Sequence, residues 1–505
     1  MDKTVIIGGG VAGLSAGIYT RLLGGEATVI EANNTCGGAL CGWRRGEWRI
    51  DNCIHWLTGT NPETPTYKMW CDLGALGGIP IHQGDTLYSF EKNGKRVSLF
   101  RSLEKTEQDM LAASPEDARE TGAFISAVRI LRGIQGTAGE NKDGKFSFSE
   151  KIKGAPRLIR YHTMSIGALA KRFKSPVLKG FFRCFLGDDF TAITLVIIFA
   201  TFTADNGGIP EGASVGMAKR ITDRFLNLGG EVLLGRAAAR INLQGKRAVS
   251  VSLADGSEVL CDSVIIAKDP AEVFGKMLTV KMPSDLKKLY SDRRAYRFSS
   301  IHTAFGFEGA PSFSGDLIIE VPRAYRPVIN SEYLVLREFS HDKHSAPEGK
   351  TLISAMVFCK EDKARAFIAE RNSYPAYALT KERISECMKE ILIAKFPEMQ
   401  DKLRIIDCWT PATYKRYLGT ECGSYMSFIF PPWKIPPKIS NKVEGFENIY
   451  MATQWATLPG GLPLAAEEGR KCAKIIAAAR EKAGQPQPKK ARIPFGRAKG
   501  ADSSL

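Results

Sequence analysis

A dinucleotide-binding pattern at the start of the sequence constrains the fold of this chain more than any other feature. Residues 4–7 are an apolar, β-branched run, which is typical of a strand buried on both faces. Gly8, Gly10 and Gly13 follow with the spacing G-x-G-x-x-G. In this pattern, the first glycine allows a tight turn and the second lets the backbone approach a pyrophosphate. The third lets the following helix pack against the sheet.

A helix, a second strand and an acidic residue complete the pattern. Residues 12–23 predict the helix, which ends at Gly24-Gly25, and residues 27–30 predict the strand. The helix N-terminus would offer backbone N–H groups to phosphates. Glu31 would accept hydrogen bonds from ribose hydroxyls and repel a 2′-phosphate. The order of these elements favours a dinucleotide-binding βαβ unit over a glycine-rich turn in an ordinary βαβ unit.

The composition is that of an ordinary globular protein. The 505 residues are 44% hydrophobic and 25% charged, so the chain is long enough for two or more domains. The eleven cysteines form no C-x-x-C pair, and no signal sequence precedes the first strand. We therefore expect reduced thiols in a cytoplasmic protein. No metal-ligand spacing is present, and we expect no metal site.

The net charge of +16 raises the question of anionic partners. No RNA- or DNA-binding motif is present, so nucleic acid is not an expected partner. A stretch at 172–183 mixes basic and aromatic residues and would suit peripheral contact with an anionic membrane; a solvated helix with one core face is the alternative. The longest apolar run, 190–204, is shorter than the ~20 residues of a membrane-spanning helix and is predicted to be core.

Turn signals and strand patterns divide the chain into alternating parts. The Asn93-Gly94 pair predicts a hairpin at 87–100, and residues 103–204 have a helical pattern. Gly207-Gly208 and the short strands that follow indicate a return to the first domain. The predicted parts are nucleotide-binding segments at 1–85, 205–290 and 441–480, a helical insertion at 86–204, a substrate-facing sheet at 291–440 and a basic, disordered tail at 481–505.

A second glycine-rich motif stands near the C-terminus. Residues 449–455 predict a strand end and a loop, and Pro459-Gly460-Gly461-Leu462-Pro463 leads into a predicted helix at 463–479. The N-terminus of this helix would point at whatever the loop binds. A further glycine pair, Gly37-Gly38, lies six residues after Glu31.

Together these motifs resemble the FAD-dependent amine oxidase superfamily, above all its branch of phytoene desaturases, carotenoid isomerases and retinol saturases. The resemblance covers nearly the whole chain. It implies an α/β fold: a Rossmann-like FAD-binding domain in three discontinuous segments, of the amine-oxidase type, with an inserted α+β substrate domain. It implies FAD as the cofactor, and it places at FAD the residues Gly8, Gly10, Val11, Ala12, Gly13, Glu31, Ala32, Gly37, Gly38, Ala39, Leu40, His55, Ala238, Gln454, Gly460, Gly461, Leu462 and Pro463.

Two positions depart from the pattern of many relatives. Gln454 stands where many members carry an acid that contacts the ribityl chain. Ala39 and Leu40 stand where many members carry a basic or hydroxyl side chain near the phosphates. We therefore expect the phosphate contacts to come mostly from the backbone.

The flavin supplies the difficult chemistry in such an enzyme, so few side chains need to react. The candidate substrate-lining residues are Trp56, Tyr425, Phe428 and Phe430, with ordinary core packing as the alternative. His55 is a candidate catalytic residue, because a free histidine pKa of ~6.5 suits proton transfer. Tyr417 and Tyr414 are weaker catalytic candidates, and both belong to the stretch 410–417, which also resembles this branch. A structural role is the alternative for all three.

The leading hypothesis is an FAD-dependent oxidoreductase that desaturates, saturates or isomerises C=C bonds of a hydrophobic, polyene or isoprenoid-like small molecule. One alternative is an amine or protoporphyrinogen oxidase. Another is a prenyl-binding protein without enzyme activity, like the GDP-dissociation inhibitors, although the intact glycine pattern argues against it. Only one dinucleotide fingerprint is present, so NAD(P)H or a quinone would act as a transient electron partner. The direction of the reaction stays open.

Overall fold

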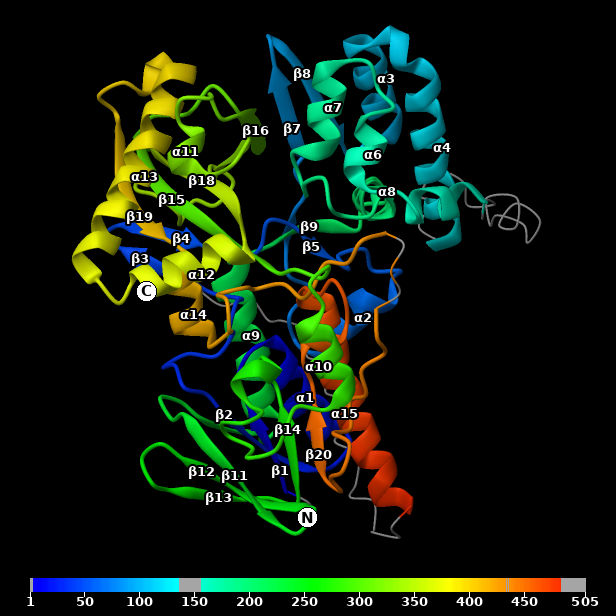
Figure 1. Ribbon diagram of the computed structural model, residues 1–505, viewed down its shortest axis with the longest axis vertical. Helices are drawn as coiled ribbons and strands as arrows, with labels where there is room; N and C mark the ends of the chain where they lie inside the picture. The colour runs from blue at the N-terminus through cyan, green and yellow to red at the C-terminus, as the bar shows by residue number, and fades with distance from the viewer. Residues whose placement is uncertain (1–2, 136–155, 433, 435, 483–505) are drawn as a thin grey trace.

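A five-stranded parallel sheet forms the centre of the nucleotide-binding domain, and its strands come from three distant stretches of the chain (Figure 1). The computed structural model describes residues 3–135, 156–432, 434 and 436–482. The strand order is β10-β2-β1-β14-β20. The strands are β1 (Lys3–Ile7), β2 (Glu26–Ile30), β10 (Glu231–Leu233), β14 (Ser263–Ile266) and β20 (Ile449–Met451). This sheet confirms the predicted α/β fold class with a discontinuous nucleotide-binding domain.

Alternate side chains of this sheet face two different layers. Ile6, Val29 and Ile265 pack against helices, whereas Val5 and Val264 pack against a small antiparallel sheet. Because both faces are covered, the strands are apolar throughout. The helices are α1 (Val11–Leu22), α2 (Pro65–Asp72), α9 (Ala213–Asn227) and α15 (Leu462–Lys482), and the small sheet contains β11 (Ala238–Gln244), β12 (Arg247–Leu253) and β13 (Glu258–Leu260).

Helix α15 brings the C-terminal motif against the N-terminal helix α1. A Cβ atom on Gly469 would lie 2.3 Å from the backbone oxygen of Ala12, so only glycine allows this approach. Ser15 Oγ donates a hydrogen bond to the backbone oxygen of Ala466 at 2.6 Å. The first two residues of the predicted tail, 481 and 482, belong to α15, and residues 483–505 lie outside the described residues.

A seven-stranded sheet forms the substrate domain, with the order β19-β15-β18-β17-β16-β7-β8. Its strands are β7 (Thr86–Lys92), β8 (Lys95–Phe100), β15 (Phe298–Glu308), β16 (Asp316–Glu320), β17 (Tyr333–Glu338), β18 (Lys350–Lys360) and β19 (Leu403–Trp409). The predicted hairpin at Asn93-Gly94 is present, and both residues have positive φ, as this turn requires. Since β7 pairs with β16, the sheet takes strands from both insertions.

The two faces of this sheet differ. Ile301 and Phe305 face a core under α13 (Tyr374–Lys395). On the opposite face, Ile318, Val335, Met356 and His302 are neighbours across four strands. The first three of these belong to a core shared with the helical insertion. On the second face, the strands on the side of β7 and β16 therefore carry apolar side chains, and β15 carries His302.

The helical insertion packs its aromatic side chains inward. Its helices are α3 (Leu103–Ala113), α4 (Ala118–Gln135), α6 (Ile166–Ala170), α7 (Pro176–Arg183) and α8 (Ala192–Phe202), and α8 is core as predicted. In the stretch 172–183, Phe173, Phe181 and Phe182 are buried and Arg172 pairs with Glu120, which favours the alternative of a helix with one core face. In the part of the chain that the structure describes, the helices are too short or too polar to cross a membrane.

Shorter elements join the two domains. They are the strands β3 (Gly42–Arg45), β4 (Trp48–Asp51), β5 (Leu57–Thr58), β6 (Ile81–His82) and β9 (Gly207–Pro210), and the helices α10 (Ser284–Ser291), α11 (Arg326–Ile329), α12 (Glu361–Glu370) and α14 (Pro411–Leu418). The chain from β4 to β5 lies at the seam between the N-terminal segment and the substrate sheet, as its contacts below show.

Candidate active site

Two glycine loops form a backbone cradle at the N-terminus of α1. A Cβ atom on Gly13 would lie 1.9 Å from the backbone oxygen of Gly8, so the turn into α1 closes only around glycine. Gly37 donates its N–H to the backbone oxygen of Gly9 at 2.9 Å, and its φ of +127° is open to glycine alone. Within the described residues, no side chain caps the helix at Gly10. The cradle therefore presents backbone N–H groups and space to a pyrophosphate.

Glu31 lies at the end of β2, beside this cradle. Its carboxylate accepts hydrogen bonds from the N–H of Gly9 at 2.7 Å and from the N–H and side-chain amide of Asn33, both at 2.8 Å. The Arg236 N–H donates to the backbone oxygen of Glu31, which brings the start of β11, at Ala238, to the same place. The predicted adenosine-side residues therefore come together at one edge of the sheet.

The C-terminal loop closes on itself through Gln454. The side-chain oxygen of Gln454 accepts the Gly461 N–H at 2.9 Å, and its amide donates to the backbone oxygen of Tyr425 at 2.9 Å. A Cβ atom on Gly460 would lie 2.8 Å from the same side-chain oxygen. Gln454 thus shapes the loop that leads into α15, and the predicted contact of Gln454 with FAD stays a prediction.

His55 lies at the seam between the N-terminal segment and the substrate sheet. Its ring is about one-third exposed, and Nδ1 lies 3.8 Å from Asp316 Oδ2. Burial and the nearby Arg337 lower the pKa of His55 below its usual value, while Asp316 opposes this effect. The ring is therefore neutral near pH 7, which leaves one nitrogen free to accept a proton.

A cluster of neutral polar side chains adjoins His55, and we call it the seam cluster. It consists of Asn52, Ser300, His302, Trp409 and Tyr414. Tyr414 and Trp409 each donate to the side-chain oxygen of Asn52 at 2.8 Å. His302 Nε2 lies 2.8 Å from Ser300 Oγ, and the ring stacks on Trp409 at 4.6 Å. Burial lowers the pKa of His302 and raises that of Tyr414, so both are uncharged at neutral pH.

Most of the seam cluster escaped prediction from the sequence. Its members come from a loop, from β15, from β19 and from α14, and only Tyr414 belongs to a stretch that the sequence singles out. The period-two alternation of β15 puts Ser300 and His302 on one face, but it does not show which partners they meet.

The predicted substrate-lining residues fall into two groups. Trp56 and Tyr425 pack against the apolar face shared with the helical insertion. Phe428 and Phe430 lie instead in a small core with Trp455. The two groups are therefore not one continuous wall, and only the first borders the apolar face of the substrate sheet.

Phe428 also packs against a buried arginine that the sequence did not single out. The guanidinium of Arg297 lies 4.9 Å from the Phe428 ring and is only 2% exposed. Arg297 binds Glu361 at 2.9 Å and Glu421 at 2.7 Å, and it lies 3.7 Å from Asp269. Because Asp269 follows β14 and Glu361 begins α12, this arginine joins the two domains.

Tyr417 does not meet His55 in the structure. Its side chain is 53% exposed, and its backbone oxygen accepts a hydrogen bond from Asn33 at 3.0 Å. Asn33 also binds Glu31, so Tyr417 lies at the adenosine end of the site. This position disfavours a role of Tyr417 in proton transfer.

The cysteines near the cradle are thiols. Cys36, Cys41 and Cys53 form no disulfide. Burial raises the pKa of Cys36 to about 12 and that of Cys41 to about 11. These thiols are therefore poor nucleophiles, which favours a structural role of the cysteines over a redox role. Among the described residues, no group of three or more His, Cys, Asp or Glu is placed to hold a metal.

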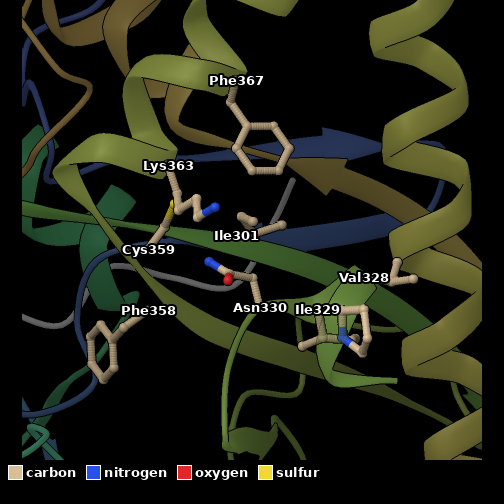
Figure 2. A pocket seen from close by; sticks show the side chains of 9 residues that line it. Ile301, Val328, Ile329, Asn330, Phe358, Cys359, Lys363 and Phe367 are labelled. Atoms are coloured by element: carbon tan, nitrogen blue, oxygen red, sulfur yellow. The ribbon is translucent and has the colours of Figure 1, made fainter. Parts of the chain in front are cut away.

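A separate cavity of about 180 Å³ opens on the opposite face of the substrate sheet (Figure 2). Asn330 and Lys363 point into it above an apolar floor. Its lining residues are Ile301, Pro327, Val328, Ile329, Asn330, Phe358, Cys359, Lys363 and Phe367. Since Ile301 faces away from His302, this cavity is distinct from the predicted redox site.

A dinucleotide cradle joined to a separate substrate domain defines the class of flavin-dependent oxidoreductases of the amine-oxidase fold. The chain belongs to the family of flavin containing amine oxidoreductases, whose model matches residues 11–477. The cradle at Gly10, Gly13 and Gly37 and the carboxylate of Glu31 fit the dinucleotide part of FAD. The enzyme is therefore an FAD-dependent oxidoreductase.

The chain is similar to a prolycopene isomerase and to a phytoene desaturase. It is 23% identical to a prolycopene isomerase of Daucus carota, over 83% of this chain and 71% of that protein. It is 24% identical to a lycopene-forming phytoene desaturase of a Paracoccus species, over 84% of this chain and 86% of that protein. An oxidoreductase from Methanosarcina mazei shares the fold with a TM-score of 0.58 at 16% identity, over 94% and 99% of the two chains. The predicted resemblance to the desaturase and isomerase branch is confirmed.

Proposed function

We propose that this oxidoreductase desaturates, saturates or isomerises carbon–carbon double bonds of a hydrophobic polyene or isoprenoid-like substrate. The observation that carries the proposal is the face of the substrate sheet. It runs from the apolar row of Ile318, Val335 and Met356 to the uncharged seam cluster at His302. The apolar side chains of this row are buried in the core shared with the helical insertion, and an apolar, uncharged interior of this kind suits a long apolar molecule with no charged group. The names of the two carotenoid-related proteins support the same substrate class.

FAD, when bound, supplies a hydride acceptor or donor at its N5 atom. The chain must then hold the substrate, exclude water and move one proton for each hydride. We propose that Trp56 and Tyr425 line the apolar substrate, because both pack on the core that continues this sheet face. His55 is the proposed proton acceptor or donor, because its neutral ring lies beside this face and the seam cluster.

NAD(P)H or a quinone is the proposed external electron partner, because the described glycine cradle serves a single dinucleotide. We also propose a cytoplasmic location, which the free thiols of Cys36, Cys41 and Cys53 support. With the aromatic side chains of 172–183 buried, contact with a membrane would have to use another surface.

The experiment that tests the function identifies the product. The FAD-loaded protein, in one sample oxidised and in another photoreduced, is incubated without oxygen with carotenoid, retinoid and unsaturated fatty-acid panels, and the products are analysed by mass and absorbance. Loss of two hydrogens shows desaturation, gain of two shows saturation, and an unchanged mass with altered absorbance shows isomerisation. A protein that binds FAD but converts no member of the panels would contradict the proposed substrate class.

A further inference from the structure

A buried ion pair of the substrate sheet faces the loop that carries His55. Arg337 and Asp316 are neighbours across β17 and β16. Arg337 Nε donates to Asp316 Oδ1 at 2.6 Å, and Nη2 donates to Oδ2 at 2.7 Å. The two side chains are only 9% and 6% exposed. This bidentate geometry holds the carboxylate in one orientation.

Arg337 of this pair also binds the backbone of the N-terminal segment at two points. Arg337 Nη1 donates to the backbone oxygen of Ile54 at 3.0 Å, and Nη2 donates to that of His55 at 2.9 Å. Asp316 Oδ2 lies 3.8 Å from Nδ1 of the His55 ring. Both the backbone and the ring of His55 are therefore set by residues of the other domain.

A buried ion pair is not by itself a strong source of stability, since desolvation offsets much of the attraction. Apolar side chains in place of Arg337 and Asp316 would join the two domains as well. What an ion pair adds is a fixed carboxylate oxygen beside one particular ring nitrogen. A carboxylate in that place favours the tautomer that carries its proton on Nδ1.

We propose that Asp316 and Arg337 are positioning residues that hold His55 with its proton on Nδ1, so that Nε2 exchanges the substrate proton. The proposal rests on the proposed function, in which His55 moves that proton. Nε2 is suited to the task, because no hydrogen bond engages it among the described residues. In a desaturation, a hydride would leave one carbon for bound FAD, the proton of the neighbouring carbon passes to the Nε2 lone pair, and the electrons of that second C–H bond form the new double bond.

The charges around His55 decide how its protonation changes with pH. The facing groups are Asp316, Arg337, Asp51 and His302. Asp316 and Asp51 favour the protonated ring, whereas Arg337 and burial oppose it. Removing the Asp316 charge therefore lowers the pKa of His55 further, and the limb of the pH–rate profile that reports His55 moves to lower pH.

The test compares Asp316→Asn with Asp342→Asn in the FAD-loaded enzyme. Asp342 is a matched control, because it binds Arg49 at 2.7 Å and also joins the N-terminal segment to the substrate domain without touching His55. We expect Asp316→Asn to lower kcat by about 10- to 100-fold with little change in KM, and to shift the pH–rate profile. Asp342→Asn should keep the wild-type profile. An unshifted profile for Asp316→Asn would overturn the proposal.

A second measurement needs no variant that disturbs the ion pair. NMR of the wild-type protein with isotope-labelled histidine, assigned through His55→Gln, reports which ring nitrogen carries the proton. We expect Nδ1, and a proton on Nε2 would overturn the proposal. This readout does not depend on turnover, so it decides the role of Asp316 even if every polyene fails as a substrate and the proposed function falls.

Discussion

The FAD cradle and the seam cluster are built in opposite ways. The cradle uses backbone atoms of two short loops, and its key contacts join Gly8 to Gly13 and Gly9 to Gly37. The seam cluster uses side chains that lie as far as 362 residues apart, as Asn52 and Tyr414 do. The cradle therefore depends on local backbone geometry, whereas the seam cluster, which we propose borders the substrate, exists only once two domains meet.

The largest expected effect comes from a substitution that disrupts the glycine cradle alone. In Gly13→Ala, the new Cβ atom would lie 1.9 Å from a backbone oxygen, so the turn must open. We expect the bound flavin, measured by visible absorbance per protein, to fall to a small fraction of wild type. Gly122→Ala is the control, because nothing lies within 4 Å of its Cβ position in α4. Normal flavin content in Gly13→Ala would refute the cradle.

A second prediction concerns the buried ion pairs of Arg297, which join the two domains. Arg297→Gln leaves Asp269, Glu361 and Glu421 without their buried cation, and we expect a loss of about 3–5 kcal/mol in the free energy of unfolding. Arg365→Gln is the control, because Arg365 binds two of the same carboxylates but is 47% exposed. Urea unfolding measures both. Equal losses in the two variants would show that burial of Arg297 does not matter.

A third prediction uses pH to weaken the seam. The Arg337 guanidinium lowers the pKa of Asp316 to about 2, below the ~3.9 of an unfolded chain. The stabilisation from this ionised carboxylate is complete above pH ~4 and is lost as the pH falls toward 2. We expect a loss of about 2 kcal/mol over that window, from urea unfolding at a series of pH values. In Asp316→Asn this acid-dependent loss should shrink; an identical loss would exclude Asp316 as its source.

The smallest expected effects distinguish the two groups of aromatic residues, with Trp56 in the first group and Phe428 in the second. Trp56→Ala should raise KM for a polyene about 10-fold, because it removes apolar surface beside the proposed substrate. Phe428→Ala should lower the unfolding temperature and leave KM nearly unchanged, because Phe428 packs on Arg297. Steady-state kinetics and thermal unfolding of both variants decide the matter. A raised KM in Phe428→Ala alone would reverse the assignment.

Sequence reasoning succeeded where structure is local. The Gly8–Gly13 turn, the Asn93-Gly94 hairpin and the strands on both sides of Glu31 follow from short-range rules of glycine conformation and side-chain alternation. At the stretch 172–183 the sequence leaves two interpretations open, because it shows an amphipathic pattern but not which layer covers its aromatic face.

The same limit applies within the site. His55 was a candidate from its place after the glycine pair, but its partners Asp316 and Arg337 come from β16 and β17. Tyr417 was a candidate because of its motif, yet α14 places it beside Asn33. The pairing of β16 with β17 decides the first case and the placement of α14 decides the second, and no local pattern encodes either.

The most direct test of the central claim is an anaerobic titration of the FAD-loaded protein, followed by flavin absorbance. One series adds polyenes to oxidised and to photoreduced enzyme, and the other adds aliphatic amines to the oxidised enzyme. We predict that a polyene changes the flavin redox state in at least one direction and that the amines leave the flavin oxidised. Reduction by an amine, with no response to any polyene, would contradict the account.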